Sequence, residues 1–305
     1  MKCFVTGASG FVGGHVVRML AESRIPFGVL VRNESSGRKL EHLAPHIKMF
    51  YGDMHNDSAL SEALESFQPD TILHLGWSGV ASKNRDGAEQ LLNLQTSIKL
   101  FQLARDFGVR AIVALGSQSE YGPKSIVIDE DCACAPTTMY GATKLASSAI
   151  GVQFCKLSQI RFVWLRLFSC FGPGDHAGAM IPSLITSLLA GEKPALTAAK
   201  QLWDYLYVND AAYAVVHAAS NAAMNGIFNL ASGEAVELRK VVECIRDQID
   251  IAMPLGFGEI EYKSGAPMNL EANVCKLVAS GWEPRTSLLD GIKSTIDWVR
   301  KESRQ

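Results

Sequence analysis

A tyrosine and a lysine four residues apart, Tyr140 and Lys144, are the pair in this sequence best suited to proton transfer. They open a stretch with helical character, where residues i and i+4 share one face. A nearby ammonium stabilises a phenolate, so we expect Lys144 to lower the pKa of Tyr140 and make it a general acid or base near neutral pH. Ser117 follows an apolar strand at the sheet edge where ligands bind, and its hydroxyl suits a substrate oxygen. The ordinary alternatives are an exposed helical pair and a turn serine.

A glycine-rich turn lies near the start of the chain, in the segment Thr6-Gly7-Ala8-Ser9-Gly10-Phe11-Val12-Gly13. Gly7 permits a tight turn after a strand, Gly10 lets backbone amides approach a pyrophosphate, and Gly13 lets the next helix pack closely on the sheet. The helix N-terminus then faces the anion. The segment therefore predicts a dinucleotide site, although any sharp strand-to-helix turn can use glycine.

The residue after the second strand distinguishes NAD from NADP. An acidic side chain there accepts a hydrogen bond from the adenosine ribose, whereas this chain has Arg32, which can pair with a 2′-phosphate. NADP(H) is therefore favoured. NAD(H) stays possible, because Arg32 can also be a solvated surface residue and because Arg38 and Lys39 are alternative phosphate partners.

The elements that must position these residues alternate short β-branched segments with longer amphipathic ones up to about residue 168. We expect strands at residues 2–6, 27–31, 47–51, 71–75, 111–116 and 161–167. We expect helices at residues 11–23, 58–67, 89–107 and 139–157. This order predicts an α/β fold of the Rossmann type, a doubly wound parallel sheet with helices on both faces.

A change in pattern predicts a second region. The regular alternation fades after Gly172-Pro173-Gly174, so we expect a dinucleotide-binding domain at residues 1–168 and a smaller, mixed α/β substrate-binding region at 169–305. Residues 203–232 are expected to return to the first domain, through a strand at 202–208 that joins the first sheet and a helix at 210–220.

Length and composition exclude several classes of protein. The 305 residues suffice for two domains, and 48% hydrophobic with 20% charged residues is ordinary globular usage. A formal charge of -2 offers no basic excess for nucleic acid, and no apolar run approaches the roughly 20 residues that span a membrane. The chain opens on no signal-peptide pattern, and its seven cysteines include no Cys-x-x-Cys pair. We therefore expect a cytoplasmic protein with reduced thiols and no metal site.

Taken together, the motifs resemble the extended short-chain dehydrogenase/reductase family, in its group of nucleotide-sugar epimerases, dehydratases and reductases. The likeness spans essentially the whole chain. Beyond the glycine turn, it is carried by Ser117, Tyr140 and Lys144, and by the segments Asp53-Met54, His74-Leu75-Gly76, Tyr121-Gly122, Arg166-Leu167-Phe168, Gly172-Pro173-Gly174, Trp203-Asp204-Tyr205 and Gly281-Trp282-Glu283-Pro284.

The resemblance implies roles for individual residues. Ser117, Tyr140 and Lys144 match the catalytic trio, in which the tyrosine exchanges a proton at a sugar carbonyl and the lysine also holds the nicotinamide ribose. The cofactor contacts expected from the motifs and the resemblance together are Gly7, Gly10, Phe11, Val12, Gly13, Arg32, Asp53, Met54, Leu75, Gly76, Trp77, Asn93, Tyr140, Lys144 and Phe168. The candidate substrate contacts are Ser78, Gly79, Gln118, Ser169 and Trp203. The helices at 89–107 and 139–157 match those of the family's four-helix interface, which implies a homodimer.

Departures from the family's pattern limit which of the family's reactions we expect. Sugar 4,6-dehydratases have an acidic pair directly after the serine or threonine, where this chain has Gln118 and Ser119. Glu120 comes one residue later, and on an extended segment that slip turns a side chain to the opposite face. Ser169 stands where many epimerases have asparagine, and Trp203 where arginine is common. Trp203 cannot pair with a diphosphate, although it can stack on a base or a sugar ring.

We therefore expect a reductase that transfers hydride from NADPH to a nucleotide-linked 4-keto(-6-deoxy) sugar, similar to 4-ketoreductases of the abequose synthase type. One alternative is a nucleotide-sugar 4-epimerase that keeps a tightly bound NAD. A second alternative is a non-catalytic NADP-binding sensor, which Tyr140 and Lys144 together argue against.

Overall fold

Seven parallel strands form the main sheet, in the order β10-β6-β5-β4-β1-β2-β3. The computed structural model describes residues 1–262, 265 and 267–303. The central strands are continuous runs of buried apolar side chains, as expected where helices cover both faces. The strands are β1 (Cys3–Thr6), β2 (Phe27–Val31), β3 (Ile47–Tyr51), β4 (Thr71–His74), β5 (Ala111–Ser117), β6 (Arg161–Leu167) and β10 (Gly226–Leu230).

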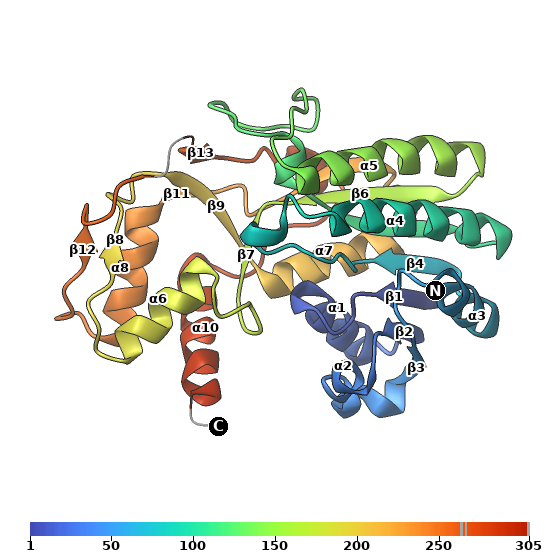
Figure 1. Cartoon of the computed structure of the whole chain (residues 1–305), viewed down its shortest axis with the longest axis horizontal. Helices are drawn as coiled ribbons and strands as arrows, with labels where there is room; N and C mark the ends of the chain where they lie inside the picture. Colours follow the sequence, from blue (N-terminus) through green and yellow to red (C-terminus); the bar gives the residue numbers. More distant parts are fainter. Residues whose placement is uncertain (263–264, 266, 304–305) are drawn as a thin grey trace.

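Helices cover both faces of this sheet (Figure 1). The buried faces of α1 (Phe11–Glu22) and α7 (Val208–Ser220) share one apolar core with the sheet. The buried faces of α3 (Asp57–Phe67), α4 (Glu89–Asp106) and α5 (Met139–Leu157) share the core on the other face. The expected Rossmann-type α/β fold is confirmed, and each predicted strand of the first domain and each predicted helix there ends within two residues of its predicted bounds.

A smaller lobe follows β6, drawn on the left of Figure 1. Its mixed sheet contains β7 (Ser169–Phe171), β9 (Leu202–Tyr207), β11 (Ala235–Glu237) and β13 (Asn269–Leu270), and β8 (Ala195–Leu196) pairs with β12 (Gly256–Phe257). The helices α6 (Met180–Leu189), α8 (Leu238–Ile249) and α10 (Leu288–Glu302) enclose a core of their own. The short elements are α2 (Glu34–Arg38), α9 (Cys275–Val278), η1 (Glu41–His46), η2 (Ser82–Asn84) and η3 (Gln118–Glu120).

The predicted return of residues 202–208 to the first sheet is wrong. β9 pairs with β7, β11 and β13 in the smaller sheet, because β7 starts two residues after β6 ends and offers β9 a parallel partner there. The chain returns to the main sheet with the next helix, α7, and then with β10. The alanine-rich face of α7 packs on the main sheet, and β10 pairs with β6.

Candidate functional site

The turn after β1 is shaped for an anion. Gly7 has a φ of +75°, and a Cβ at this position would lie 2.5 Å from the backbone nitrogen of Gly76. A Cβ at Gly13 would collide with the Gly7 carbonyl oxygen. Helix α1 has Gly10 at its N-cap, with no side-chain cap and no acidic residue in its first turn, so its first amides stay available to a ligand. The cradle therefore fits the pyrophosphate of a dinucleotide, and Phe11 and Val12 lie in that first turn.

Arg32 directly follows β2, beside the place expected for adenosine. Its Nε lies 3.5 Å from Asp53 Oδ2, and the two side chains are 63% and 43% exposed. Such an exposed pair contributes little, so Arg32 is free to turn to a phosphate. Arg38 lines a neighbouring surface depression with Asn33, Glu34, Glu41 and Tyr51, and Lys39 is exposed.

The loop after β4 forms a wall held in place by helix α4. Asn93 accepts a hydrogen bond from the Ser78 backbone nitrogen and donates one to the Ser78 carbonyl, both at 2.9 Å. Gln90 accepts from Trp77 Nε1 at 2.9 Å and donates to the Gly79 carbonyl at 2.9 Å. Both polar ends of Asn93 are thus engaged in supporting the wall.

The remaining expected cofactor residues lie around this wall. Leu75 and Gly76 open it, and a Cβ at Gly76 would lie 2.8 Å from Met54 Sδ. Phe168 is buried between β6 and β7, with its ring centroid 6.4 Å from that of Tyr121.

Ser117, Tyr140 and Lys144 meet at the carboxyl edge of β5. Ser117 ends β5, and its hydroxyl accepts a hydrogen bond from Ser119 N at 3.1 Å. Tyr140 and Lys144 lie in the first two turns of α5, and both are buried. The Tyr140 backbone nitrogen donates to the Arg85 carbonyl at 2.8 Å, which ties the segment before α4 to the start of α5.

The expected effect of Lys144 on Tyr140 is wrong in this structure. Burial raises the pKa of Tyr140, and the Ser117 hydroxyl and the Arg85 guanidinium, 5.2 Å from the phenol ring centroid, act in the opposite direction. Lys144 is engaged elsewhere, because its ammonium donates to the Leu115 carbonyl and lies 3.7 Å from the centroid of the Trp77 ring. Burial lowers the pKa of Lys144 to about 7.

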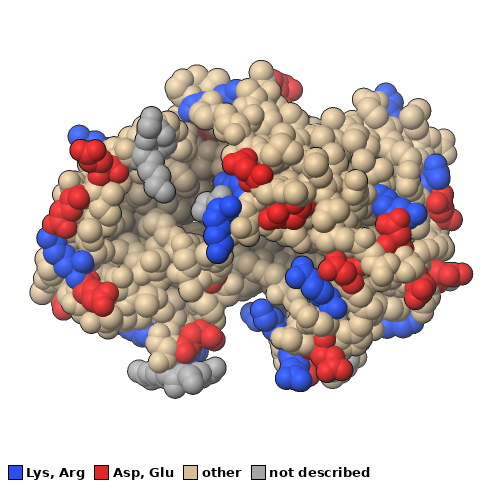
Figure 2. Space-filling model, in the orientation of Figure 1, with Lys and Arg blue, Asp and Glu red and all other residues tan. Residues whose placement is uncertain are grey.

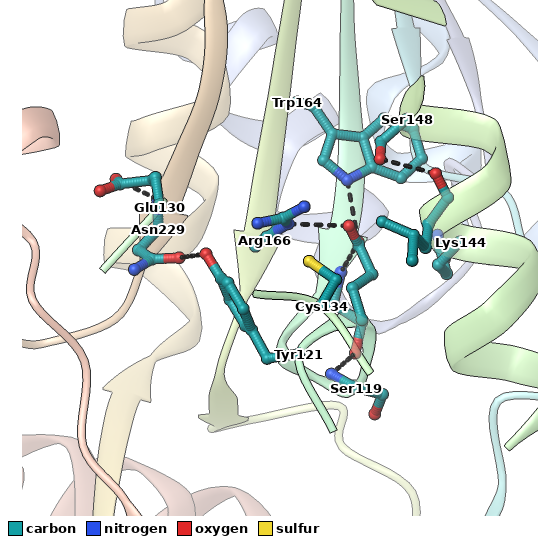
Figure 3. A network of polar contacts seen from close by, with 12 residues as sticks. Ser119, Tyr121, Glu130, Cys134, Lys144, Ser148, Trp164, Arg166 and Asn229 are labelled. Atoms are coloured by element: carbon teal, nitrogen blue, oxygen red, sulfur yellow. Dashed lines mark hydrogen bonds and ion pairs between the residues drawn. The ribbon is translucent and has the colours of Figure 1, made fainter. Parts of the chain in front are cut away.

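Two residues around the trio were missed by the sequence analysis. The first is Arg85, whose guanidinium lies over the Tyr140 ring. Glu120 was only excluded as an acid, and nothing in its local sequence indicates its partner. The extended segment expected there is wrong, because Gln118–Glu120 form η3. Glu120 is fully buried, and its Oε2 accepts a hydrogen bond from Arg166 Nε at 2.8 Å. Figure 3 shows the network around Arg166, which includes Trp164 and Lys144.

The candidate substrate residues fall into two groups. Ser78 and Gly79 belong to the wall, and Gln118 follows Ser117 directly. Ser169 and Trp203 lie on β7 and β9 of the smaller sheet. The Trp203 ring stacks on Tyr205 with 6.2 Å between centroids, and its buried Nε1 has no hydrogen-bond partner among the described residues. Figure 2 shows a hollow between the two lobes.

Two further findings concern the part of the chain that the structure describes. Nowhere in it do three or more His, Cys, Asp or Glu side chains gather so that they could hold a metal ion. None of its helices combines the length and the apolar character needed to cross a membrane.

Comparison with known proteins agrees with this geometry. The model of a family described as "NAD dependent epimerase/dehydratase family" matches residues 3–231. A UDP-glucose 4-epimerase of Azospirillum brasilense is 26% identical, over 98% of this chain and 92% of that protein. A dTDP-4-dehydro-6-deoxyglucose reductase of Escherichia coli is 22% identical, over 97% of this chain and 96% of that protein. The structure of the UDP-glucose 4-epimerase of Thermus thermophilus in complex with NAD superposes with a TM-score of 0.84 at 23% identity, over 98% of this chain and 99% of that one.

Proposed function

Because the chain belongs to the NAD dependent epimerase/dehydratase family, we propose that it is an oxidoreductase that reduces a nucleotide-linked 4-keto-6-deoxy sugar with NADPH. Proteins similar to it include both sugar epimerases and a 4-keto sugar reductase. The observation that favours reduction is the set of proton-donating and acidic groups in the site. The site offers a buried tyrosine as proton donor, and the carboxylate that follows the serine is bound to Arg166. Reduction of a ketone needs one proton donor and no further acid or base.

The glycine turn and the wall are the residues that would hold the dinucleotide. Gly7, Gly10 and Gly13 would form the cradle for its pyrophosphate, and Lys144 would hold the nicotinamide ribose, as the resemblance implies. When bound, NADPH supplies a hydride to the carbonyl carbon. Arg32 supports NADPH over NADH, because its exposed guanidinium can form a bidentate pair with the 2′-phosphate.

Side chains of the protein supply the proton that the reduction needs. The Ser117 hydroxyl donates a hydrogen bond to the carbonyl oxygen, and Tyr140 transfers its phenolic proton to that oxygen as the C=O double bond opens. A new C–H bond and a new O–H bond result, and the phenolate left on Tyr140 is reprotonated from solvent. Arg85 lies over the same ring and stabilises the phenolate while it exists.

The second candidate is a 4-epimerase that retains NAD. The relatives favour it, since a UDP-glucose 4-epimerase aligns with almost the whole chain. The same three residues would serve, with Tyr140 first removing a proton and later returning it. Ser169 and Trp203 support the reductase instead, because they stand where epimerases commonly have asparagine and arginine.

We further propose how the lobes divide the work and how the chain assembles. Residues 1–168 would bind the dinucleotide, and residues 169–305 would contribute Ser169 and Trp203 to the nucleotide sugar in the hollow between the lobes. A homodimer would form through α4 and α5. Their exposed Leu91, Leu92 and Ile150 support this, since apolar side chains of this size on neighbouring helices gain from being covered.

The cofactor released by denaturation separates the two reactions. Freshly purified protein is denatured, and any dinucleotide is identified by chromatography and counted per chain. We expect an empty protein that afterwards binds NADPH more tightly than NADH. Near-stoichiometric NAD would instead identify the epimerase, which must keep its cofactor through the cycle.

A further inference from the structure

Glu120 is a buried carboxylate joined to the catalytic trio. Its side chain is fully enclosed, and each oxygen has partners: Oε1 accepts from Ser117 N at 2.8 Å and from Trp164 Nε1 at 2.9 Å, and Oε2 accepts from Arg166 Nε at 2.8 Å. A buried carboxylate is tolerated only when it is paired and hydrogen-bonded in this way. The bond to Ser117 N fixes the backbone of the residue whose hydroxyl is to contact the substrate.

Gly116, the residue before Ser117, leaves the space that this carboxylate occupies. A Cβ at Gly116 would collide with Trp164 Nε1 and lie 2.5 Å from Glu120 Oε1, so only glycine leaves room for the arrangement. Ser117 and Glu120 also cap η3 reciprocally, the serine hydroxyl accepting from the backbone of the turn and the glutamate from the Ser117 backbone. Glu120 is therefore held in one position relative to Ser117.

Lys144 lacks a direct counter-charge. It is 4% exposed, and none of the described carboxylates forms an ion pair with it. Its Nζ lies 5.6 Å from the centroid of the Trp164 ring, and the Nε1 of that ring donates to Glu120. Glu120 is the charge that acts on Lys144, and it raises the pKa that burial lowers. An opposite charge near a buried ammonium favours its charged form.

We infer that Glu120 is a positioning residue of this site, whose buried carboxylate fixes the Ser117 backbone and favours the ammonium form of Lys144. The inference deepens the proposed function and rests on it for the role of Lys144. It also gives Arg166 a part, since its guanidinium balances Glu120 and stacks on the Tyr121 ring at 4.4 Å (Figure 3). A purely structural ion pair would stabilise the fold without affecting the charge on Lys144.

The test is Glu120→Gln, which retains the acceptor for Ser117 N and removes the charge. NADPH binding is titrated by fluorescence from pH 5 to 10, and kcat/KM for the keto sugar is measured over the same range. Without Glu120, Lys144 loses its proton at lower pH, so we expect the alkaline midpoint of both profiles to fall by about one unit. Because Glu120→Gln leaves Arg166 without its partner, the double variant Glu120→Gln/Arg166→Gln is measured beside it, and we expect the same downward shift.

The matched control is Glu130→Gln. Glu130 belongs to the same polar network and accepts a hydrogen bond from Asn229 N at 2.7 Å, on the side of Tyr121 away from Lys144 (Figure 3). We expect its profiles to match those of the wild type. Unchanged alkaline midpoints in both Glu120 variants would overturn the inference. Because NADPH binding needs no sugar, a shift in binding without turnover of any sugar would leave the role of Glu120 standing and reject the proposed reaction alone.

Discussion

Tyr140 lies buried within reach of the Ser117 hydroxyl, and burial raises the pKa of its phenol. The phenol therefore holds its proton at neutral pH, and Arg85 and Ser117 reduce the free energy needed to give it up. Burial lowers the pKa of Lys144, because it favours the neutral amine over the ammonium. The groups around Tyr140 thus determine how readily it gives up its proton in the proposed reaction.

Replacing Tyr140 by phenylalanine removes only the hydroxyl. We expect kcat for the keto sugar to fall by about 10²-fold or more, the usual contribution of a general acid, while the NADPH dissociation constant stays within about twofold. Steady-state kinetics and fluorescence titration measure the two quantities. Tyr213→Phe on α7 is the control and retains activity. An active Tyr140→Phe protein would contradict the assigned role.

Replacing Arg32 by glutamate tests the cofactor preference. A charge-assisted hydrogen bond is worth about 1.5–3 kcal/mol, so we expect NADPH to bind roughly 10- to 100-fold more weakly and NADH to be little affected. The control, Arg110→Glu, alters another exposed arginine, which precedes β5 at the amino end of the strands, whereas Arg32 follows the carboxyl end of β2. Equal losses for both dinucleotides would show that Arg32 does not read the 2′-phosphate.

Motif spacing was enough to find the glycine turn, which depends on a few neighbouring residues, whereas the family resemblance was needed to group Ser117 with Tyr140 and Lys144. Motif spacing could not reveal the residues that contact and position the trio. Glu120 and Arg166 are 46 positions apart, and Arg85 meets Tyr140 only when the segment before α4 docks on α5. The expected Tyr140 pKa was wrong for the same reason, since Lys144 contacts Leu115 and Trp77 rather than the phenol.

The elements of the main sheet could be predicted closely because each strand is a local run of apolar residues whose pattern needs no partner. The placement of β9 could not. Its sheet is decided by β7, a three-residue strand too short to recognise beforehand. The junction of β1, β4 and α4 is likewise visible only in three dimensions: His74 contacts Thr6 Oγ1 at 2.9 Å and Ser97 Oγ at 3.1 Å.

This junction predicts a pH dependence of stability. Burial lowers the pKa of His74 from 6.5 to about 3, so the unfolded chain binds a proton between these values and the folded chain does not. The folded state should therefore lose stability as the pH falls below 6.5. Relative to His74→Gln, which does not titrate there, wild type should lose about 2 kcal/mol between pH 7 and pH 5. Urea unfolding at both pH values measures this difference, and a constant difference would contradict it.

The whole molecule brings two lobes together over one hollow (Figure 2). His15 on α1 joins them, with Nδ1 2.6 Å from Asn209 Oδ1 and Nε2 2.8 Å from the Pro173 carbonyl oxygen. The expectation of a smaller, mixed second region came from the fading alternation after Gly174. The arrangement of its helices could not be foreseen, because their packing depends on a core gathered from distant segments.

Assembly is tested at the same scale. If α4 and α5 form a dimer interface, Leu92→Arg/Ile150→Arg places two charges in it and should convert a dimer to a monomer, as measured by light scattering after size-exclusion chromatography. Ile251→Arg alters an exposed apolar residue of the other lobe and should leave the dimer intact. A wild-type monomer, or a variant that stays dimeric, would reject this interface.

The proposed reduction is tested most directly by following the hydride. The protein is incubated with a nucleotide diphosphate 4-keto-6-deoxyhexose and NADPH deuterated at C4 of the nicotinamide, each epimer in turn, and the product is examined by NMR. We predict one NADPH oxidised per sugar reduced, with deuterium at C4 of the sugar from one of the two epimers. Inversion of a nucleotide sugar at C4 without NADPH consumption, and without deuterium in the product, would contradict the account and identify an epimerase.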